Sequence, residues 1–147
     1  MSLNSMDVNQ KYRCPAIALL LTIAFLALPH PAHSNYYSVA PDPGDLLQFN
    51  GVLVDIREPY EWQQTGIVEG SKTITYRHTE DFIEHLEPHL NQELRPIALI
   101  CRTGNRTRQA AHLLSQKVDA PVINIEGGIF RLMHLGYRPV PYQDEEP

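Results

Sequence analysis

The sequence predicts an α/β fold with a mainly parallel central sheet and helices on both of its faces. From residue 51 onward, short apolar runs alternate with segments whose apolar residues recur at helical spacing, as in strand–helix–strand units. The 147 residues suit one domain with an appended segment. With 43% apolar and 20% charged residues, the composition is that of a globular protein and excludes wholesale disorder.

Residues 1–34 have the layout of an export signal. A positively charged stretch at 11–13 precedes a run at 16–28 that is apolar except for Thr22, and the small residues Ala32 and Ser34 follow. The run is shorter than the about 20 residues that a membrane-spanning helix needs. We therefore expect a cleaved signal peptide and an exported, periplasmic or otherwise extracytoplasmic protein with no membrane contact after processing. An uncleaved N-terminal anchor is the alternative.

Four strands are expected in the remaining chain. Residues 36–50 contain proline and glycine, and only a short helical turn is predicted there, within 42–49. The compact run at 51–55 ends in a carboxylate, as expected of a buried parallel strand. The run at 96–100 has the strongest signal and is predicted to be the central strand. The remaining two strands are predicted at 72–75 and 122–125.

Four helices connect and follow these strands. The first, 59–64, begins with proline at its N1 position and ends at Thr65-Gly66. Thr79 is expected to cap the second, which Pro88 ends or distorts. The last is predicted at 129–135. The third, 107–118, is amphipathic, and its inward face is predicted to consist of Ala110, Ala111, Leu113 and Leu114.

The segment Cys101-Arg102-Thr103-Gly104-Asn105-Arg106-Thr107 joins the predicted central strand to the third helix. Ligands of such sheets bind beyond the carboxyl ends of the strands. Backbone N–H groups at a helix start lack intrahelical partners and point at whatever the loop holds. Gly104 and Asn105 tolerate left-handed conformations that fold successive amides into an anion-binding nest. Three cations lie within seven residues here, namely Arg102, Arg106 and Arg108.

A thiol in such a loop should ionise easily and attract a small anion, so Cys101 is predicted to be a nucleophile. The alternative is a buried structural cysteine at a strand end. The chain has two cysteines, Cys14 and Cys101, too few for a disulfide framework or a four-thiolate zinc site. Loss of the signal peptide leaves Cys101 alone. The net charge of −5 lacks the positive footprint of a duplex-binding protein, so nucleic acid is not expected as a partner.

Three blocks, in this order and spacing, resemble the rhodanese-like sulfurtransferases in their single-domain form. The blocks are residues 52–59 (VLVDIREP) followed by Glu61-Trp62, the loop 101–106, and residues 125–129 (IEGGI) leading to 136–140. The resemblance covers 46–140 and leaves 35–45 as a lead-in and 141–147 as an acidic tail.

The resemblance implies that Cys101 carries sulfane sulfur as a persulfide and that residues 102–107 bind the substrate. The basic loop is similar to that of the thiosulfate-using members. The implied reaction transfers sulfur from thiosulfate or a similar donor to a thiol, or to cyanide in an assay, and no cofactor or metal is expected. Residues 65–71 lack the histidine that many members carry there, so a role for one is excluded. The aromatic residue after the Gly-Gly pair is replaced by Leu132 or displaced to Phe130, which affects the core and not the chemistry.

Two other function classes share parts of this pattern. Cysteine phosphatases and arsenate reductases place an arginine six positions after the cysteine, whereas here Arg106 is fifth and Thr107 is sixth. The smaller ring of amides favours sulfur transfer over binding of a tetrahedral oxyanion. A non-catalytic persulfide carrier or interaction module on the same fold remains open, because a fold does not determine turnover.

Other polar residues have simpler interpretations. His85 and His89 lie four apart on one helix face, but no third ligand is spaced to join them in a zinc site, so we interpret them as surface histidines. Asp55 and Arg57 are expected to tie the end of the first strand to a neighbouring loop. Tyr60 and Trp62 are left open, as core residues or as the wall of a pocket.

Overall fold

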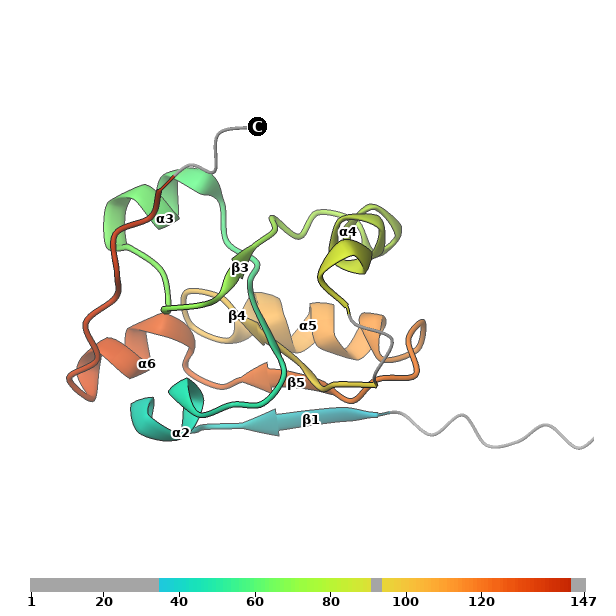
Figure 1. Ribbon diagram of the computed structural model, residues 1–147, viewed down its shortest axis with the longest axis horizontal. Coiled ribbons are helices and arrows are strands. Elements are labelled where there is room, and N and C mark those ends of the chain that lie inside the picture. The colour runs from blue at the N-terminus through green and yellow to red at the C-terminus, as the bar shows by residue number, and fades with distance from the viewer. Residues whose placement is uncertain (1–34, 91–93, 144–147) are drawn as a thin grey trace, which may run out of the picture. The chain divides into compact units, whose positions relative to one another are not determined.

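A computed structural model describes residues 35–90 and 94–143, which form one α/β unit. Five strands in this part of the chain make a parallel sheet in the order β1-β5-β4-β2-β3 (Figure 1). The strands are β1 (Tyr36–Val39), β2 (Val52–Asp55), β3 (Lys72–Thr73), β4 (Ile97–Ile100) and β5 (Val122–Ile125). The predicted fold class is therefore confirmed. The predicted signal peptide and residues 144–147 of the predicted acidic tail lie outside the described residues.

Helices flank the sheet on both faces. They are α2 (Pro43–Leu47), α3 (Pro59–Thr65), α4 (Thr79–Leu86), α5 (Asn105–Leu114) and α6 (Gly128–His134), and a 3-10 turn, η1 (Glu87–His89), follows α4 at the predicted proline. No helix within the described ranges combines the length and the apolarity needed to cross a membrane.

Alternating side chains of the strands build two separate cores. On one face, Val54 and Leu99 pack with Phe82 of α4 and Leu114 of α5. On the other face, Leu46 of α2 and Ile129 and Leu132 of α6 cover the strand residues Leu53, Ala98 and Ile100. Because β4 is buried on both faces, its sequence is continuously apolar, which is why its position was predictable.

The strand β1 was not predicted. It is an edge strand whose last three residues are exposed, so it carries no alternating apolar pattern. Its place is fixed instead by pairing with β5, in a register that sets Ser38 beside Asn124. The lead-in segment thus contributes a strand to the sheet, and that strand brings the polar side chain of Ser38 next to the buried side chain of Asn124.

Two predicted helix features are wrong. His78, not Thr79, is the N-cap residue of α4, and the Thr79 hydroxyl instead hydrogen-bonds the Tyr76 hydroxyl at 2.8 Å. Leu113 is 38% exposed and does not face inward. The buried face of α5 has helical spacing and consists of Thr107, Ala110, Ala111 and Leu114.

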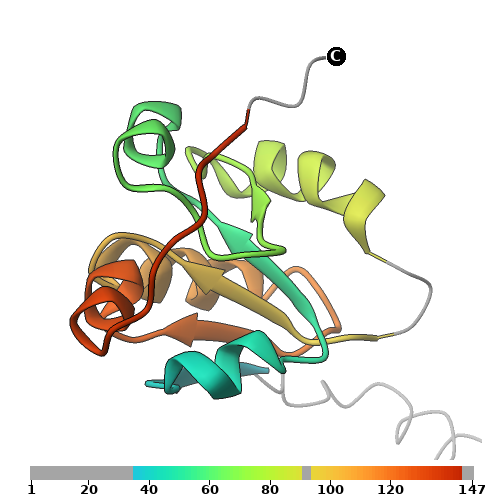
Figure 2. The ribbon, with the colours of Figure 1, turned by 60° about the vertical axis from the view of Figure 1, so that its left-hand side comes forward.

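The C-terminal segment returns along the molecule to α3, as Figure 2 shows in red. Val140 and Ile67 exchange two backbone hydrogen bonds, of 2.9 and 3.0 Å, in an isolated antiparallel bridge. The ring of Tyr142 lies 5.2 Å from that of Trp62. Trp62 is thereby buried beneath the chain end, so α3 is held in place from its outer side as well as from the sheet.

Candidate active site

Cys101 follows the last residue of β4, at the carboxyl end of the sheet, and is only 1% exposed. Its Sγ accepts a hydrogen bond of 3.2 Å from the Gly104 N–H. Burial raises the pKa of the Cys101 thiol, but hydrogen bonds with the Thr107 side chain and with the N–H groups of Thr107, Thr103 and Gly104 outweigh it, so the pKa lies below the ordinary thiol value. These hydrogen bonds, which oppose the effect of burial, favour an ionisable thiol over an inert structural one.

The orientation of the loop amides comes from the helix α6. The N–H groups of Ile129 and Phe130 donate to the carbonyls of Cys101 and Arg102, at 2.9 and 3.1 Å. In a trans peptide the C=O and N–H point in opposite directions, so anchoring these carbonyls turns the following N–H groups away from α6. The N–H of Thr103 is turned in this way toward the sulfur.

Glycines allow this close approach of α6 to the loop. Gly128 has φ +56°, and a Cβ on it would lie 2.3 Å from the carbonyl oxygen of Cys101. Gly104 has φ +89° and lies so close to the Gly127 backbone that a Cβ would come within 2.9 Å of its nitrogen. The Gly-Gly pair of the third sequence block therefore shapes the loop that holds the thiol.

Thr107 reaches the thiol from the first turns of α5. Its Oγ1 lies 3.6 Å from the Cys101 Sγ and 2.5 Å from the Oδ1 of Asn124, a fully buried residue of β5. Sequence analysis placed Thr107 in the substrate-binding loop but assigned nothing to Asn124. The available signal was a single polar residue within an otherwise apolar strand.

Arg106 points to α3, where it forms a two-pronged ion pair with Glu61. Both Nη atoms of Arg106 donate to the Glu61 carboxylate at 2.7 Å. Burial raises the pKa of the Glu61 carboxyl, but the hydrogen bonds from Arg106 and from the Glu58 N–H outweigh it and lower that pKa. The same ion pair raises the pKa of Arg106, whose charge also acts on the Cys101 thiolate. Glu61 is part of the first sequence block, but the sequence alone predicts no role for it.

The buried arginine of the first block braces α3 against the sheet, as expected. Arg57 is 1% exposed and binds the Asp55 carboxylate through Nε and Nη2, at 2.7 to 3.0 Å. It also donates to the carbonyl of Gly66 and to the hydroxyl of Thr65, each at 2.7 Å. The prediction that Asp55 and Arg57 tie the strand end to a neighbouring loop is therefore confirmed.

The other predicted loop residues lie at the rim of the site. The guanidinium of Arg102 stacks over the Phe130 ring at 4.5 Å, and Asn105 is exposed as the first residue of α5. A pocket of about 60 Å³ opens beside Arg102 and Phe130. Its lining comes from α3 and its flanks, the loop and α6: Arg57, Tyr60, Glu61, Gln64, Thr65, Arg102 and Phe130. It has room for a small inorganic anion.

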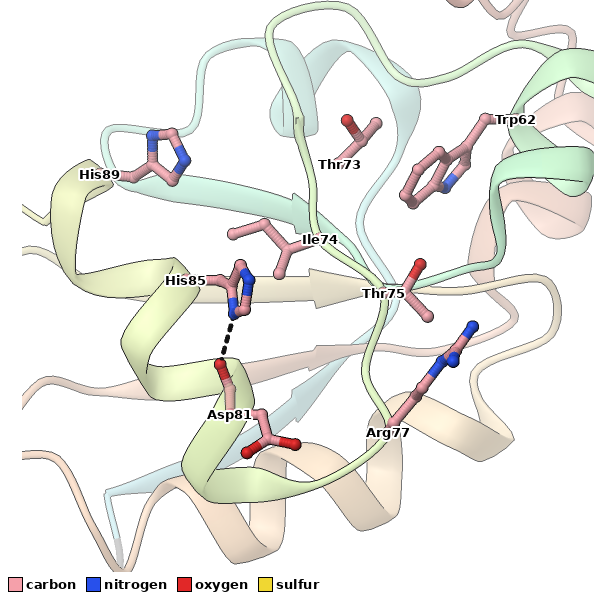
Figure 3. A pocket seen from close by; sticks show the side chains of 8 residues that line it. All are labelled: Trp62, Thr73, Ile74, Thr75, Arg77, Asp81, His85 and His89. Carbon is pink, nitrogen blue, oxygen red and sulfur yellow. Dashed lines mark hydrogen bonds between the residues drawn. The ribbon is translucent and has the colours of Figure 1, made fainter. Parts of the chain in front are cut away.

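A larger pocket of about 460 Å³ lies between α3, β3 and α4 (Figure 3). His85 and His89 line it, together with Asp81, Trp62 and residues of the β3 edge. The Nδ1 of His85 lies 2.7 Å from the Asp81 carbonyl oxygen, so that nitrogen is engaged within the helix. Within residues 35–90 and 94–143, no group of three His, Cys, Asp or Glu side chains is arranged to hold a metal ion.

The sequence is similar to a known domain family and to named proteins of that family. The rhodanese-like domain family matches residues 43–134. The thiosulfate sulfurtransferase GlpE of Ectopseudomonas mendocina is 29% identical over 96 residues, which cover 65% of this chain and 83% of that protein. The enzyme of the same name from Pseudomonas aeruginosa strain LESB58 is 29% identical over 95 residues, covering 64% and 81%.

Two solved structures have the same fold. The rhodanese-related protein of Thermoplasma volcanium is 28% identical, with a TM-score of 0.56, and the match covers 70% of this chain and 98% of that one. A protein of unknown function from Rhodopseudomonas palustris, described as a possible tyrosine phosphatase, is 27% identical with a TM-score of 0.59. That match covers 74% of this chain and 87% of the other.

Proposed function

Because this chain belongs to the family of rhodanese-like domains, we propose that it is a thiosulfate sulfurtransferase that works through a persulfide on Cys101. Sulfur transfer is the chemistry that the family and the named relatives support. The proposed persulfide mechanism rests on the position of the Cys101 thiol, which lies at a strand end among N–H groups of its own loop. This environment stabilises a sulfur anion, both before and after transfer.

In the first half of the reaction, the Cys101 thiolate attacks the outer, sulfane sulfur of thiosulfate. A bond forms between Sγ and that sulfur, the sulfur–sulfur bond of thiosulfate breaks, and its electron pair leaves with sulfite. The product is a persulfide anion on Cys101, facing the loop amides. Arg106 supplies positive charge near the sulfur, which favours approach of the dianion.

In the second half, a nucleophile attacks the outer sulfur of the persulfide. Cyanide or a thiolate forms a bond to that sulfur, the Cys101–sulfur bond breaks, and its electron pair returns to Cys101 as the thiolate. The two half-reactions make a double displacement with ping-pong kinetics. The pocket of about 60 Å³ beside Arg102 supports a small inorganic donor over a bulky one.

The test is mass spectrometry of the protein after incubation with thiosulfate. The wild type should gain one sulfur atom, and cyanide should remove it with release of thiocyanate. Cys101→Ser should gain none, whereas the matched variant Arg108→Ala, on the same helix, should behave like the wild type. Equal labelling of the wild type and Cys101→Ser would refute the assignment.

The alternative function, a non-catalytic persulfide carrier on the same fold, is distinguished from a sulfurtransferase by its turnover. A catalyst converts many equivalents of thiosulfate and cyanide to thiocyanate, whereas a carrier stops after about one per protein chain. For the phosphatase alternative, we expect no hydrolysis of p-nitrophenyl phosphate, because four residues and not five separate Cys101 from Arg106.

We also propose that the protein acts outside the cytoplasm, after removal of residues 1–34. The support is the order of charged, apolar and small residues in that segment. Fractionation of the native host should recover the protein in the extracytoplasmic fraction. Recovery of the intact chain in the membrane fraction would identify an anchor instead.

A further inference from the structure

A chain of hydrogen bonds runs from the thiol to the edge of the sheet. Thr107 Oγ1 lies 2.5 Å from Asn124 Oδ1, and Asn124 Nδ2 donates to Ser38 Oγ at 2.7 Å. The Ser38 hydroxyl donates to Glu126 Oε1 at 2.8 Å. Thr107 and Asn124 are fully buried, whereas Ser38 and Glu126 are exposed. A buried asparagine side chain in a central strand needs such partners, because an unpaired amide there is costly.

The donor and acceptor of each hydrogen bond in this series follow from its outermost member, Glu126. An ionised carboxylate only accepts hydrogen bonds, so the single proton of Ser38 goes to Glu126. Ser38 must then accept from the Asn124 NH₂ group, which leaves the Asn124 oxygen facing Thr107. The Thr107 hydroxyl also has one proton, and that oxygen is its closest acceptor, ahead of the Gly104 carbonyl at 3.0 Å.

We propose that Asn124, oriented by Ser38 and Glu126, is a positioning residue that holds the Thr107 hydroxyl proton away from the sulfur of Cys101. The neutral thiol then meets a lone pair of the Thr107 oxygen, which can accept the S–H proton. A thiolate receives the stabilising hydrogen bond from the Thr107 hydroxyl only in competition with Asn124. We call the hydrogen-bonded series of Thr107, Asn124, Ser38 and Glu126 the relay. The relay therefore controls how readily Cys101 ionises. Its catalytic meaning rests on the proposed sulfur transfer, but the hydrogen-bond control does not.

Asn124→Leu removes the competing oxygen while keeping the side-chain size. The Gly104 carbonyl, at 3.0 Å, is then the remaining neutral competitor of the thiolate for the Thr107 proton, and a hydrogen bond to a charged group is stronger than one to a neutral group. We expect the pH profile of Cys101 alkylation to move to lower pH. The rate below its midpoint should rise roughly three- to tenfold, since the gain in thiolate outweighs its lower intrinsic reactivity.

The experiment measures iodoacetamide alkylation of Cys101 against pH in single and double variants. In a Thr107→Val background, Asn124→Leu should cause no further change, because the hydroxyl through which Asn124 acts is gone. A purely structural role of Asn124 would change both backgrounds alike. The charged groups that face the thiol, Arg106 of α5 with its partner Glu61 of α3, are untouched by these substitutions.

Ser38→Ala provides a second test at an exposed position of an edge strand, where folding is not at stake. It should move the profile in the same direction as Asn124→Leu, by less. The matched control is Ser71→Ala, whose hydroxyl bonds the Val68 carbonyl outside the relay. If Ser38→Ala matches this control or moves the profile to higher pH, the proposal is overturned. A persistent effect of Asn124→Leu in the Thr107→Val background would also overturn it.

The alkylation profile requires no thiosulfate, so it is independent of the proposed function. If thiosulfate leaves no persulfide on the wild type, the sulfurtransferase proposal fails while the relay is still judged on alkylation. If the persulfide forms and the profiles do not shift as described, the relay fails and the sulfurtransferase proposal stands.

Discussion

Replacement of Arg106 by alanine leaves the Glu61 carboxylate without its two-pronged partner. The Glu61 side chain is 10% exposed, whereas that of Arg106 is 43% exposed. Each hydrogen bond to a charged group is worth about 1.5–3 kcal/mol in a buried setting. Solvent around the half-exposed guanidinium screens the pair, so we expect Arg106→Ala to lower the free energy of unfolding by about 2 kcal/mol in total at pH 7.

The loss should depend on pH with a definite sign. The pKa of Glu61 is lowered in the folded protein, chiefly because the hydrogen bonds from Arg106 and Glu58 outweigh the effect of burial. The ion pair therefore stabilises the fold fully above the ordinary glutamate pKa and ceases to do so as the pH falls through the lowered value. Urea unfolding of both proteins between pH 7 and about 3 should show the two stabilities converging toward acid.

The same substitution removes a cation near the sulfur, so the pKa of Cys101 should rise and its alkylation profile should move to higher pH. Thiosulfate kcat/KM should fall roughly 10- to 150-fold, the factor that corresponds to losing one charge-assisted interaction at the sulfur. Arg108→Ala is the control, because Arg108 has no ion pair in the described part of the chain. A stability loss that is the same at pH 7 and at pH 3, or equal effects of the two variants, would refute this reasoning.

Three further outcomes are expected. Gly128→Ala should abolish persulfide formation and lower the free energy of unfolding by about 2 kcal/mol or more. The added Cβ collides with the Cys101 carbonyl, and the φ of residue 128 is left-handed. Denaturation and thiosulfate labelling check this. Arg57→Lys should cost about 2–4 kcal/mol in urea unfolding, since lysine cannot replace a buried guanidinium that bonds several acceptors at once. N-terminal sequencing of protein from the native host should begin at Asn35, and a start at Met1 would contradict cleavage.

The sequence predicted those parts of the fold that local pattern determines. The strand at 97–100 is apolar throughout because it is buried on both faces, and the loop after it carries its own glycine and helix start. The four predicted strands and four predicted helices all occur, with ends shifted by a few residues. The position of Cys101 at the carboxyl end of the central strand followed directly from these elements.

What the sequence did not reveal depends on partners far along the chain. The strand Tyr36–Val39 exists because β5 offers it a free edge, and its own residues carry little signal. The partner of Arg106 is Glu61, 45 positions earlier, and no local pattern relates the two residues. Asn124 was visible as a polar residue among apolar ones, but its role required the register that sets it beside Ser38.

The docking of the first described residue in the sheet bears on when the chain is processed. The Asn35 carbonyl accepts from the Val122 N–H at 2.7 Å, and its side-chain amide donates to the Asp119 carbonyl at 2.8 Å. Proteases cut where the backbone is exposed and not tied into structure. If the chain is cut before Asn35, as proposed, β1 joins the sheet only after the peptidase has acted. Maturation then precedes final folding, and the new N-terminus starts directly at the sheet.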